Sequence, residues 1–248
     1  EDMLVRISVH NRGPERAQLH VLPTLWFRNT WSSGDDSPRP VLRDAHGGIL
    51  ASHPELGQYM LSCDGGPELL FTENESNAER LWGQPNATPY VKDAFHRYVI
   101  GGDRGAVNPA RTGTKAAAHY VVDVPAGGCE VVRLRLAAGA ESQPFGAAFE
   151  QGFQQRLADA DEFYDRITPP SFGEDERRVH RQALAGMLWT KQYYYFDVDR
   201  WLKEHDAHPL TGGAGRAPRN AEWFHMLNGD VISMPDKWEY PWYAAWDL

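Results

Sequence analysis

The sequence predicts an α+β protein in which an antiparallel β-sandwich precedes a series of helices. Up to about residue 140, short strand-like runs are separated by clusters of Gly, Pro, Asn and Asp, a pattern typical of antiparallel sheets. After about residue 145, apolar residues recur at helical spacing instead. Strands followed by helices indicate either one α+β fold or two domains in sequence.

The expected strands begin with residues 5–9, in which apolar and polar side chains alternate. Pro23 separates two of the runs, and because proline has no N–H to donate, it indicates a sheet edge or a bulge. Residues 125–128, Pro-Ala-Gly-Gly, turn the chain into the last strand. The expected strands are 5–9, 18–22, 25–27, 58–62, 69–72, 97–100, 119–124 and 130–136.

Two helices are expected next, at residues 147–167 and from about residue 174 to Tyr195. Pro169 and Pro170 end the first helix, since proline cannot continue it. A short helix is also expected from Pro241 onward, and no further sheet is expected in this part. The apolar faces of the first two helices comprise Phe149, Phe153, Leu157, Ala160, Tyr164 and Ile167, and Val179, Ala183, Leu184, Met187 and Leu188.

The second helix carries its own start signals. Residues 171–174, Ser-Phe-Gly-Glu, fit a capping box, in which a Ser and a Glu three residues later satisfy free backbone N–H groups. Glu174, Asp175 and Glu176 then lie against the positive end of the helix dipole. These features place the start of the helix near residue 173.

Charge and composition exclude several classes of partner. The 248 residues carry a formal net charge of −9 and a pI near 5.6, whereas nucleic acids and anionic membranes are bound by basic faces. No apolar run approaches membrane-spanning length. Cys63 and Cys129 are too few for a disulfide scaffold, and although one bond between them is the alternative, we expect free thiols in a reducing compartment, the cytoplasm. His205 and His208 lack the spacing and neighbours of a zinc site, so loop or surface histidines are expected, with no metal and no cofactor.

The most informative segment is residues 236–248, where carboxylates alternate with aromatic rings. Five of the nine residues 238–246 are aromatic, and Asp236, Glu239 and Asp247 are interleaved with them. Indole and phenol rings stack on the C–H faces of sugars, while carboxyl groups bind sugar hydroxyls or donate a proton to a glycosidic oxygen. A buried aromatic core with surface acids is the alternative. Because the acids lie inside the run, the pattern favours a carbohydrate site.

Asp247 is the strongest candidate for a catalytic group. The indoles of Trp242 and Trp246 would desolvate its carboxyl group and favour the protonated form that a general acid needs. The alternative is an Asp on a helix surface. The expected substrate-binding residues also have structural alternatives, which are core packing for the aromatic ones and helix capping or ion pairs for the polar ones. They are Arg219, Asn220, Asp236, Lys237, Trp238, Glu239, Tyr240, Trp242 and Trp246.

Three stretches of the chain resemble glycoside hydrolase family 63. Residues 220–248 resemble the start of its catalytic domain, and residues 25–31 and 108–120 resemble the same proteins. The similarity is greatest to the bacterial glucosidase-like members, relatives of processing α-glucosidase I and mannosylglycerate hydrolase. The resemblance implies inverting hydrolysis of an α-glycosidic bond, with Asp247 as general acid and a base located after residue 248.

The resemblance also implies a domain organisation. Residues 1–144 would be a β-sandwich domain, 145–172 a linker helix, and 173–248 the first helices of an (α/α) barrel. Since the chain begins in a strand and ends in a helix, we expect an internal fragment that lacks the catalytic base. The expected ligand is a small oligosaccharide or glycoside, and the sequence leaves the oligomeric state open. The alternative function is a noncatalytic carbohydrate-binding or scaffolding module.

Overall fold

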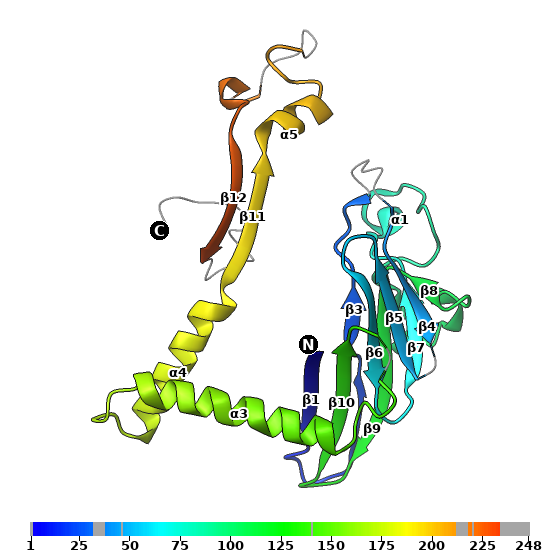
Figure 1. The fold of residues 1–248 in the computed structure, drawn as a ribbon. Coiled ribbons are helices and arrows are strands. Elements are labelled where there is room, and N and C mark those ends of the chain that lie inside the picture. Colours follow the sequence, from blue (N-terminus) through cyan, green and yellow to red (C-terminus); the bar gives the residue numbers. More distant parts are fainter. Residues whose placement is uncertain are drawn as a thin grey trace. The chain divides into compact units, whose positions relative to one another are not determined.

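The computed structural model describes residues 2–31, 38–45, 47–139, 141–211, 218–219 and 221–233. The chain divides into two compact units, Glu1–Leu157 and Ala158–Leu248, which are described separately below (Figure 1). Antiparallel strands dominate the first unit, and the second combines helices with a two-stranded sheet. At this level the predicted α+β class is confirmed.

The first sheet of the β-rich unit has six strands, and all of its neighbouring pairs are antiparallel. In sheet order they are β1 (Asp2–His10), β10 (Cys129–Ala137), β6 (Gly57–Cys63), β5 (Gly48–His53), β4 (Val41–Ala45) and β8 (Thr112–Gly113). The hairpin of β4 and β5 was not predicted, because the sequence of β4 includes Arg43 and Asp44 and shows no regular alternation. Gly48 is required here by a close approach, since a Cβ at this position would lie 2.0 Å from the carbonyl oxygen of Leu61.

The second sheet is organised around its longest strand, β9 (Lys115–Val124). On one side β9 pairs with β7 (Glu68–Thr72), and on the other with β2 (Ala17–Val21) and β3 (Thr24–Trp26). Pro23 separates β2 from β3, and its carbonyl oxygen accepts a hydrogen bond from the Ala118 N–H. The predicted interruption at Pro23 is therefore confirmed.

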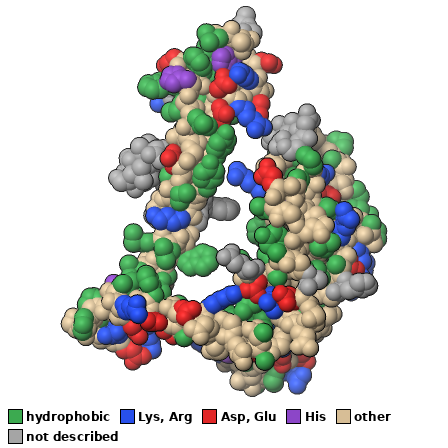
Figure 2. Space-filling model, viewed as in Figure 1, with side chains coloured by type: hydrophobic (Ala, Val, Ile, Leu, Met, Phe, Trp, Pro, Cys, Tyr) green, Lys and Arg blue, Asp and Glu red, His purple; other side chains and the backbone are tan. Residues whose placement is uncertain are grey.

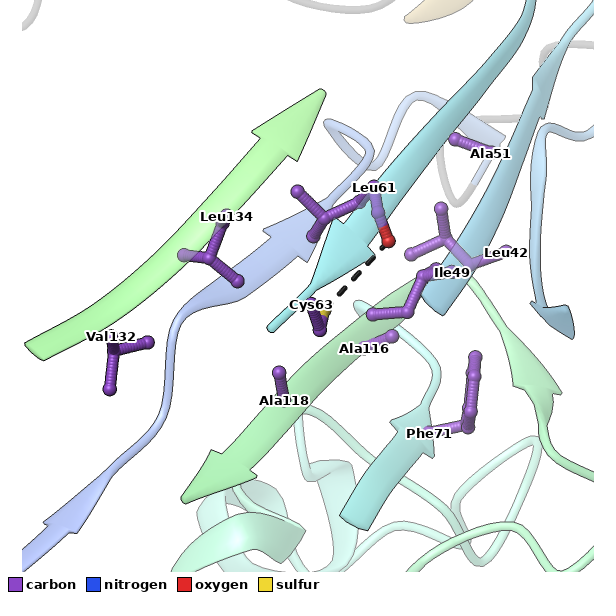
Figure 3. Close-up of a cluster of buried hydrophobic side chains, with 10 residues drawn as sticks. All are labelled: Leu42, Ile49, Ala51, Leu61, Cys63, Phe71, Ala116, Ala118, Val132 and Leu134. Atoms are coloured by element: carbon purple, nitrogen blue, oxygen red, sulfur yellow. Dashed lines mark hydrogen bonds between the residues drawn. The ribbon is translucent and has the colours of Figure 1, made fainter. Parts of the chain in front are cut away.

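A hydrophobic core fills the space between the two sheets (Figure 3). Phe71 on β7 is fully buried and lies opposite Ala116 on β9, so that a large ring is placed beside a small side chain. Burial of one large apolar side chain contributes roughly 1.5–3 kcal/mol to stability. The buried members of the cluster come from both sheets: Leu42, Ile49, Ala51, Leu61, Cys63, Phe71, Ala116, Ala118, Val132 and Leu134.

A short helix covers the outer face of the second sheet, where the sequence had indicated a strand. The prediction of a strand at residues 97–100 is wrong, because α2 (Ala94–Val99) occupies most of this segment. Phe95 and Tyr98 lie one helical turn apart, are both buried, and pack against Leu70 and Ala117 of the sheet. The four-residue window 97–100 omitted Phe95 and so concealed the helical period. The unit also contains α1 (Ala78–Trp82) and the 3₁₀ turn η2 (Arg104–Ala106).

The long helix α3 (Ala147–Ile167) is confirmed with both predicted ends. Its first half packs on β1, where the guanidinium of Arg6 lies 4.2 Å from the ring centroid of Phe153. Arg156 forms an ion pair with Asp2 at 2.6 Å, and the pKa of Asp2 is lowered, first by the hydrogen bond from Arg156. Phe149 is almost fully buried, so the predicted apolar face anchors this half of the helix.

The helix α4 (Glu174–Trp189) begins as predicted but is capped differently. Gly173 occupies the N-cap position, and its backbone N–H donates to Glu176 Oε2 at 2.7 Å. The predicted capping box of Ser171 and Glu174 is therefore wrong by two residues. Glu174, Asp175 and Glu176 do lie in the first turn, where their charges favour the positive end of the dipole.

The prediction that α4 continues to Tyr195 without further sheet is also wrong. The helix ends at Trp189, and β11 (Lys191–Asp197) pairs in antiparallel fashion with β12 (Leu227–Ser233). The aromatic run within β11 alternates between half-buried and exposed side chains, which is the period of a strand. Between these strands lie α5 (Val198–Glu204) and η3 (Ala221–Trp223), which share a small core of Val198, Leu202 and Ala221.

The two cysteines are free, as predicted, and should differ strongly in reactivity. Burial raises the pKa of the Cys63 thiol to about 12, whereas Cys129 is exposed. At pH 8, only about one Cys63 thiol in 10⁴ would be the reactive thiolate. We expect iodoacetamide to modify Cys129 alone in the native chain and both cysteines in denaturant, as measured by mass spectrometry. The Cys129→Ser variant should stay unmodified until unfolded, and equal labelling of both thiols in the native chain would contradict this assignment.

Candidate functional site

Arg219 is the single member of the predicted carbohydrate site that falls within the described residues. Its side chain is exposed, and it lies shortly before η3 in the sequence. The predicted general acid and the remaining binding residues lie outside the described residues, as does the expected helix from residue 241. Their roles stay predictions: Asn220, Asp236, Lys237, Trp238, Glu239, Tyr240, Trp242, Trp246 and Asp247.

The described elements before residue 234 already carry exposed aromatic rings. Tyr193 and Tyr195 project from the same side of β11, and their ring centroids lie 6.3 Å apart in a stacked arrangement. Trp223 is exposed and lies 6.0 Å from the ring of His225. Exposed faces of this kind are suited to apolar contact with a sugar or with another part of a protein.

The predicted apolar face of α4 is largely uncovered in the described structure. No residue of this helix is buried, and Val179, Met187 and Leu188 are each more than 60% exposed. Figure 2 shows hydrophobic side chains along the segment formed by α4 and β11. Contiguous exposed apolar patches are uncommon on soluble domains. The apolar side chains of α4 therefore form a surface suited to packing against another protein segment.

Residues 25–31 and 108–120, for which the sequence analysis predicted a relation to a glycosidase family, lie side by side in the β-rich unit. Residues 25–31 include the end of β3, and residues 108–120 include the start of β9. Leu25 is paired with Ala116, and the Phe27 N–H donates to the carbonyl oxygen of Thr114. Their proximity could not be predicted from the sequence, because about 80 residues separate them.

A polar cluster connects these two stretches. The buried Thr114 hydroxyl donates to Glu73 Oε2 at 2.6 Å. Arg39 Nη2 lies 2.9 Å from Glu73 Oε2 and 2.5 Å from Glu75 Oε1. Trp31 Nε1 donates to Glu75 Oε1 at 2.9 Å, and the Arg39 guanidinium lies 4.7 Å from the Trp31 ring centroid. The indole of Trp31 is therefore held by both a hydrogen bond and a cation–π contact.

A second polar cluster was missed because its members are dispersed along the sequence. Glu68 accepts a hydrogen bond from Tyr98, and Glu68 Oε2 lies 3.4 Å from His119 Nδ1. His119 Nε2 lies 2.7 Å from His20 Nδ1, and Arg104 stacks over Tyr98 at 4.5 Å. The cluster links β2, β7, β9, α2 and η2, so its clearest role is to join the second sheet to its covering helix.

The titration of this second cluster follows from its geometry. Burial by itself would raise the pKa of Glu68, but hydrogen bonds from Tyr98 and His119, and the charge of Arg104, outweigh it and lower the pKa. The pKa of Tyr98 is raised, first by burial and then by its hydrogen bond to Glu68. The tyrosine therefore keeps its proton, and the carboxylate keeps its charge.

His208 lies in the loop after α5, as predicted, but its side chain is buried. Its ring packs edge-on against Phe224, and its Nδ1 accepts a hydrogen bond from the Leu210 N–H at 3.2 Å. Asp199 Oδ1 lies 3.0 Å from its Nε2.

Within the described ranges, no group of three or more His, Cys, Asp or Glu side chains is arranged to hold a metal ion. No helix among the described residues has the length and apolar character needed to cross a membrane.

Comparison with known proteins adds one relative. No protein-family model matches the chain. The chain is similar to the uncharacterized protein YMR196W of Saccharomyces cerevisiae, with 35% identity over 281 aligned residues that cover 98% of this chain and 26% of the yeast protein. The chain thus spans about a quarter of the length of this relative, and the similarity extends through both structural units.

Proposed function

We propose that the chain is part of an inverting glycosidase of the family 63 type, which hydrolyses an α-glycosidic bond. The observation that carries the proposal is the interleaving of Asp236, Glu239 and Asp247 with the aromatic residues of 238–246, within a stretch that resembles the catalytic domain of this family. Asp247 is the proposed general acid. The catalytic base would come from a later part of the full-length protein.

The chemistry requires two carboxyl groups with different roles. One protonates the leaving oxygen, and the other activates a water molecule on the opposite face of the sugar, at a separation of roughly 6.5–9.5 Å. Asp247 beside Trp242 and Trp246 suits the first role, since desolvation favours its protonated form. The rings of Trp238, Tyr240, Trp242 and Trp246 would hold the sugar.

The exposed surfaces of the second unit support the proposal that residues 173–248 begin an (α/α) barrel. In such a barrel, the apolar face of each helix is covered by neighbouring helices. Val179, Met187 and Leu188 on α4 form a face of this kind, and in the described chain it is uncovered. The free cysteines support a reducing compartment, so the proposal includes a cytoplasmic location.

A noncatalytic carbohydrate-binding module is the second candidate function. It is favoured by a cavity in the β-rich unit whose described lining residues include the aromatic side chains Phe27, Trp31 and His53 and a single carboxylate, Glu55. The two functions are compatible, since a binding module and a catalytic domain often occupy one chain.

Activity of the chain and of its full-length protein provides the direct test. Both are assayed on α-glucosides and on mannosylglycerate, and the anomer that is released first is identified by NMR. We expect no hydrolysis by the 248-residue chain and inversion of configuration by the full-length protein. Hydrolysis by the chain alone, or retention by the full-length protein, would show that the residues or the family are wrongly assigned.

A further inference from the structure

A cavity of about 290 Å³ lies where β3 ends, β4 begins and β5 ends. Three aromatic side chains, Phe27, Trp31 and His53, contribute to its wall, together with the charged residues Arg28 and Arg39. We propose that this cavity binds a neutral carbohydrate of one or two pyranose rings. The site lies in the β-rich unit and does not depend on the proposed hydrolysis.

The aromatic wall is rigid before any ligand binds. Trp31 is fixed by its hydrogen bond to Glu75 and by the guanidinium of Arg39 over its ring. The ring of Phe27 lies 5.6 Å from the ring of His53. Because these rings are already ordered, a sugar can stack on them without a large loss of side-chain entropy. Pro38, Pro40 and Pro54 also line the cavity, and proline adds little conformational freedom.

The cavity supplies both donors and acceptors for hydroxyl groups. His53 Nδ1 accepts hydrogen bonds from the backbone N–H groups of Glu55 and Leu56, at 3.1 and 3.3 Å. In the neutral ring the proton therefore resides on Nε2, which is a donor. Arg28 has no ion-pair partner among the described residues and adds further donors, while Glu55 adds a carboxylate acceptor. Sugar hydroxyls both donate and accept, so this mixture suits them.

The charges around the cavity favour a neutral ligand. The charged residues that line the cavity are Arg28, Arg39 and Glu55. Arg39 also forms ion pairs with Glu73 and Glu75, which are not lining residues but are counted here with it. The formal sum is one negative charge, which disfavours a sugar phosphate or a uronic acid. The volume lies near the lower limit of ligand pockets, about 300–1,000 Å³, and so suits a small sugar.

The test measures sugar binding by the 248-residue chain with saturation-transfer NMR and calorimetry. The probes are glucose, mannose, maltose and cellobiose, with glucuronate, glucose 1-phosphate and inorganic phosphate as charged comparisons. We expect at least one neutral probe to bind and Trp31→Ala to weaken it by about tenfold or more, while Trp82→Ala, at an exposed position on α1, leaves binding unchanged. Binding should also shift the Trp31 indole N–H resonance, assigned by its loss in Trp31→Phe.

A second variant separates binding from folding, since Trp31→Ala also removes a contact of Arg39. Arg28→Met changes an exposed side chain that is unpaired in the described structure, so we expect native thermal unfolding and several-fold weaker binding. The proposal is overturned if no neutral probe binds, if Trp82→Ala weakens binding as much as Trp31→Ala, or if the charged probes bind more tightly. If the full-length protein shows no hydrolysis while the 248-residue chain still binds a neutral sugar, the proposed hydrolase function is contradicted. Sugar binding at this cavity then still holds.

Discussion

Replacement of Asp247 by Asn in the full-length protein is expected to reduce turnover by about 10²–10⁴-fold on substrates with a poor leaving group. The amide is nearly the same size as the carboxyl group but cannot donate an acidic proton to the glycosidic oxygen. The leaving group would then depart as a strongly basic alkoxide, which raises the barrier. Steady-state kinetics on an α-linked disaccharide measure the effect.

Two controls distinguish loss of the proton donor from loss of structure. A glycosyl fluoride needs little protonation on departure, so the variant should hydrolyse it at a rate much closer to that of the wild type. Asp230→Asn changes an exposed aspartate on β12 and should leave turnover on both substrates unchanged. Near-normal turnover of the disaccharide by the Asp247 variant would remove Asp247 from the mechanism.

Replacement of Phe71 by Ala is expected to destabilise the β-rich unit by about 3–5 kcal/mol. The side chain is fully buried between the two sheets, and its removal leaves a cavity among residues whose positions are fixed by the strand pairing. Hydrogen exchange of peptides that cover β9 measures this loss, because β9 is the central strand of the second sheet and belongs to the same unit.

The matched control is Phe163→Ala on α3, where the ring is 53% exposed. A substitution of the same chemistry at an exposed position should change stability by less than about 1 kcal/mol. If the amide hydrogens of β9 exchange equally slowly in the wild type and in the Phe71 variant, Phe71 is not part of the stabilising core.

Elements with a local signal could be predicted from the sequence. The limits of α3 follow from the helical recurrence of its apolar residues and from the prolines after residue 168. The strands around Pro23 and the turn at residues 125–128 also depend on the chemistry of a few neighbouring residues. Each of these signals involves only residues that are neighbours in the sequence and does not depend on a distant partner.

Elements whose conformation depends on distant partners could not be predicted in the same way. The run Tyr193–Tyr194–Tyr195 followed α4 closely enough to suggest a continued helix, but β12 pairs with it from more than 30 residues away. The short helix α2 likewise depends on the sheet surface that buries Phe95 and Tyr98. In both cases tertiary packing overrides the local preference.

The carbohydrate site was predicted entirely from residues 219–248, where acids and aromatic rings are neighbours in the sequence. The cavity beside Trp31 was not, since its wall and the network that fixes it combine Trp31, Arg39, His53, Glu75 and Thr114 from four separate segments. No spacing in the sequence indicates that these side chains meet.

The sequence by itself determined the limits of α3, the start of α4 and most strands of the two large sheets, because each depends on side chains that are close along the chain. Only the tertiary structure shows that β9 lies between β7 and the pair β2 and β3, and that β11 pairs with β12. It also shows that Trp31 is hydrogen-bonded to Glu75 and lies under the guanidinium of Arg39. Those contacts join residues 8 to about 100 positions apart. Their formation depends on burial and hydrogen bonding summed over the whole fold, which no local pattern records.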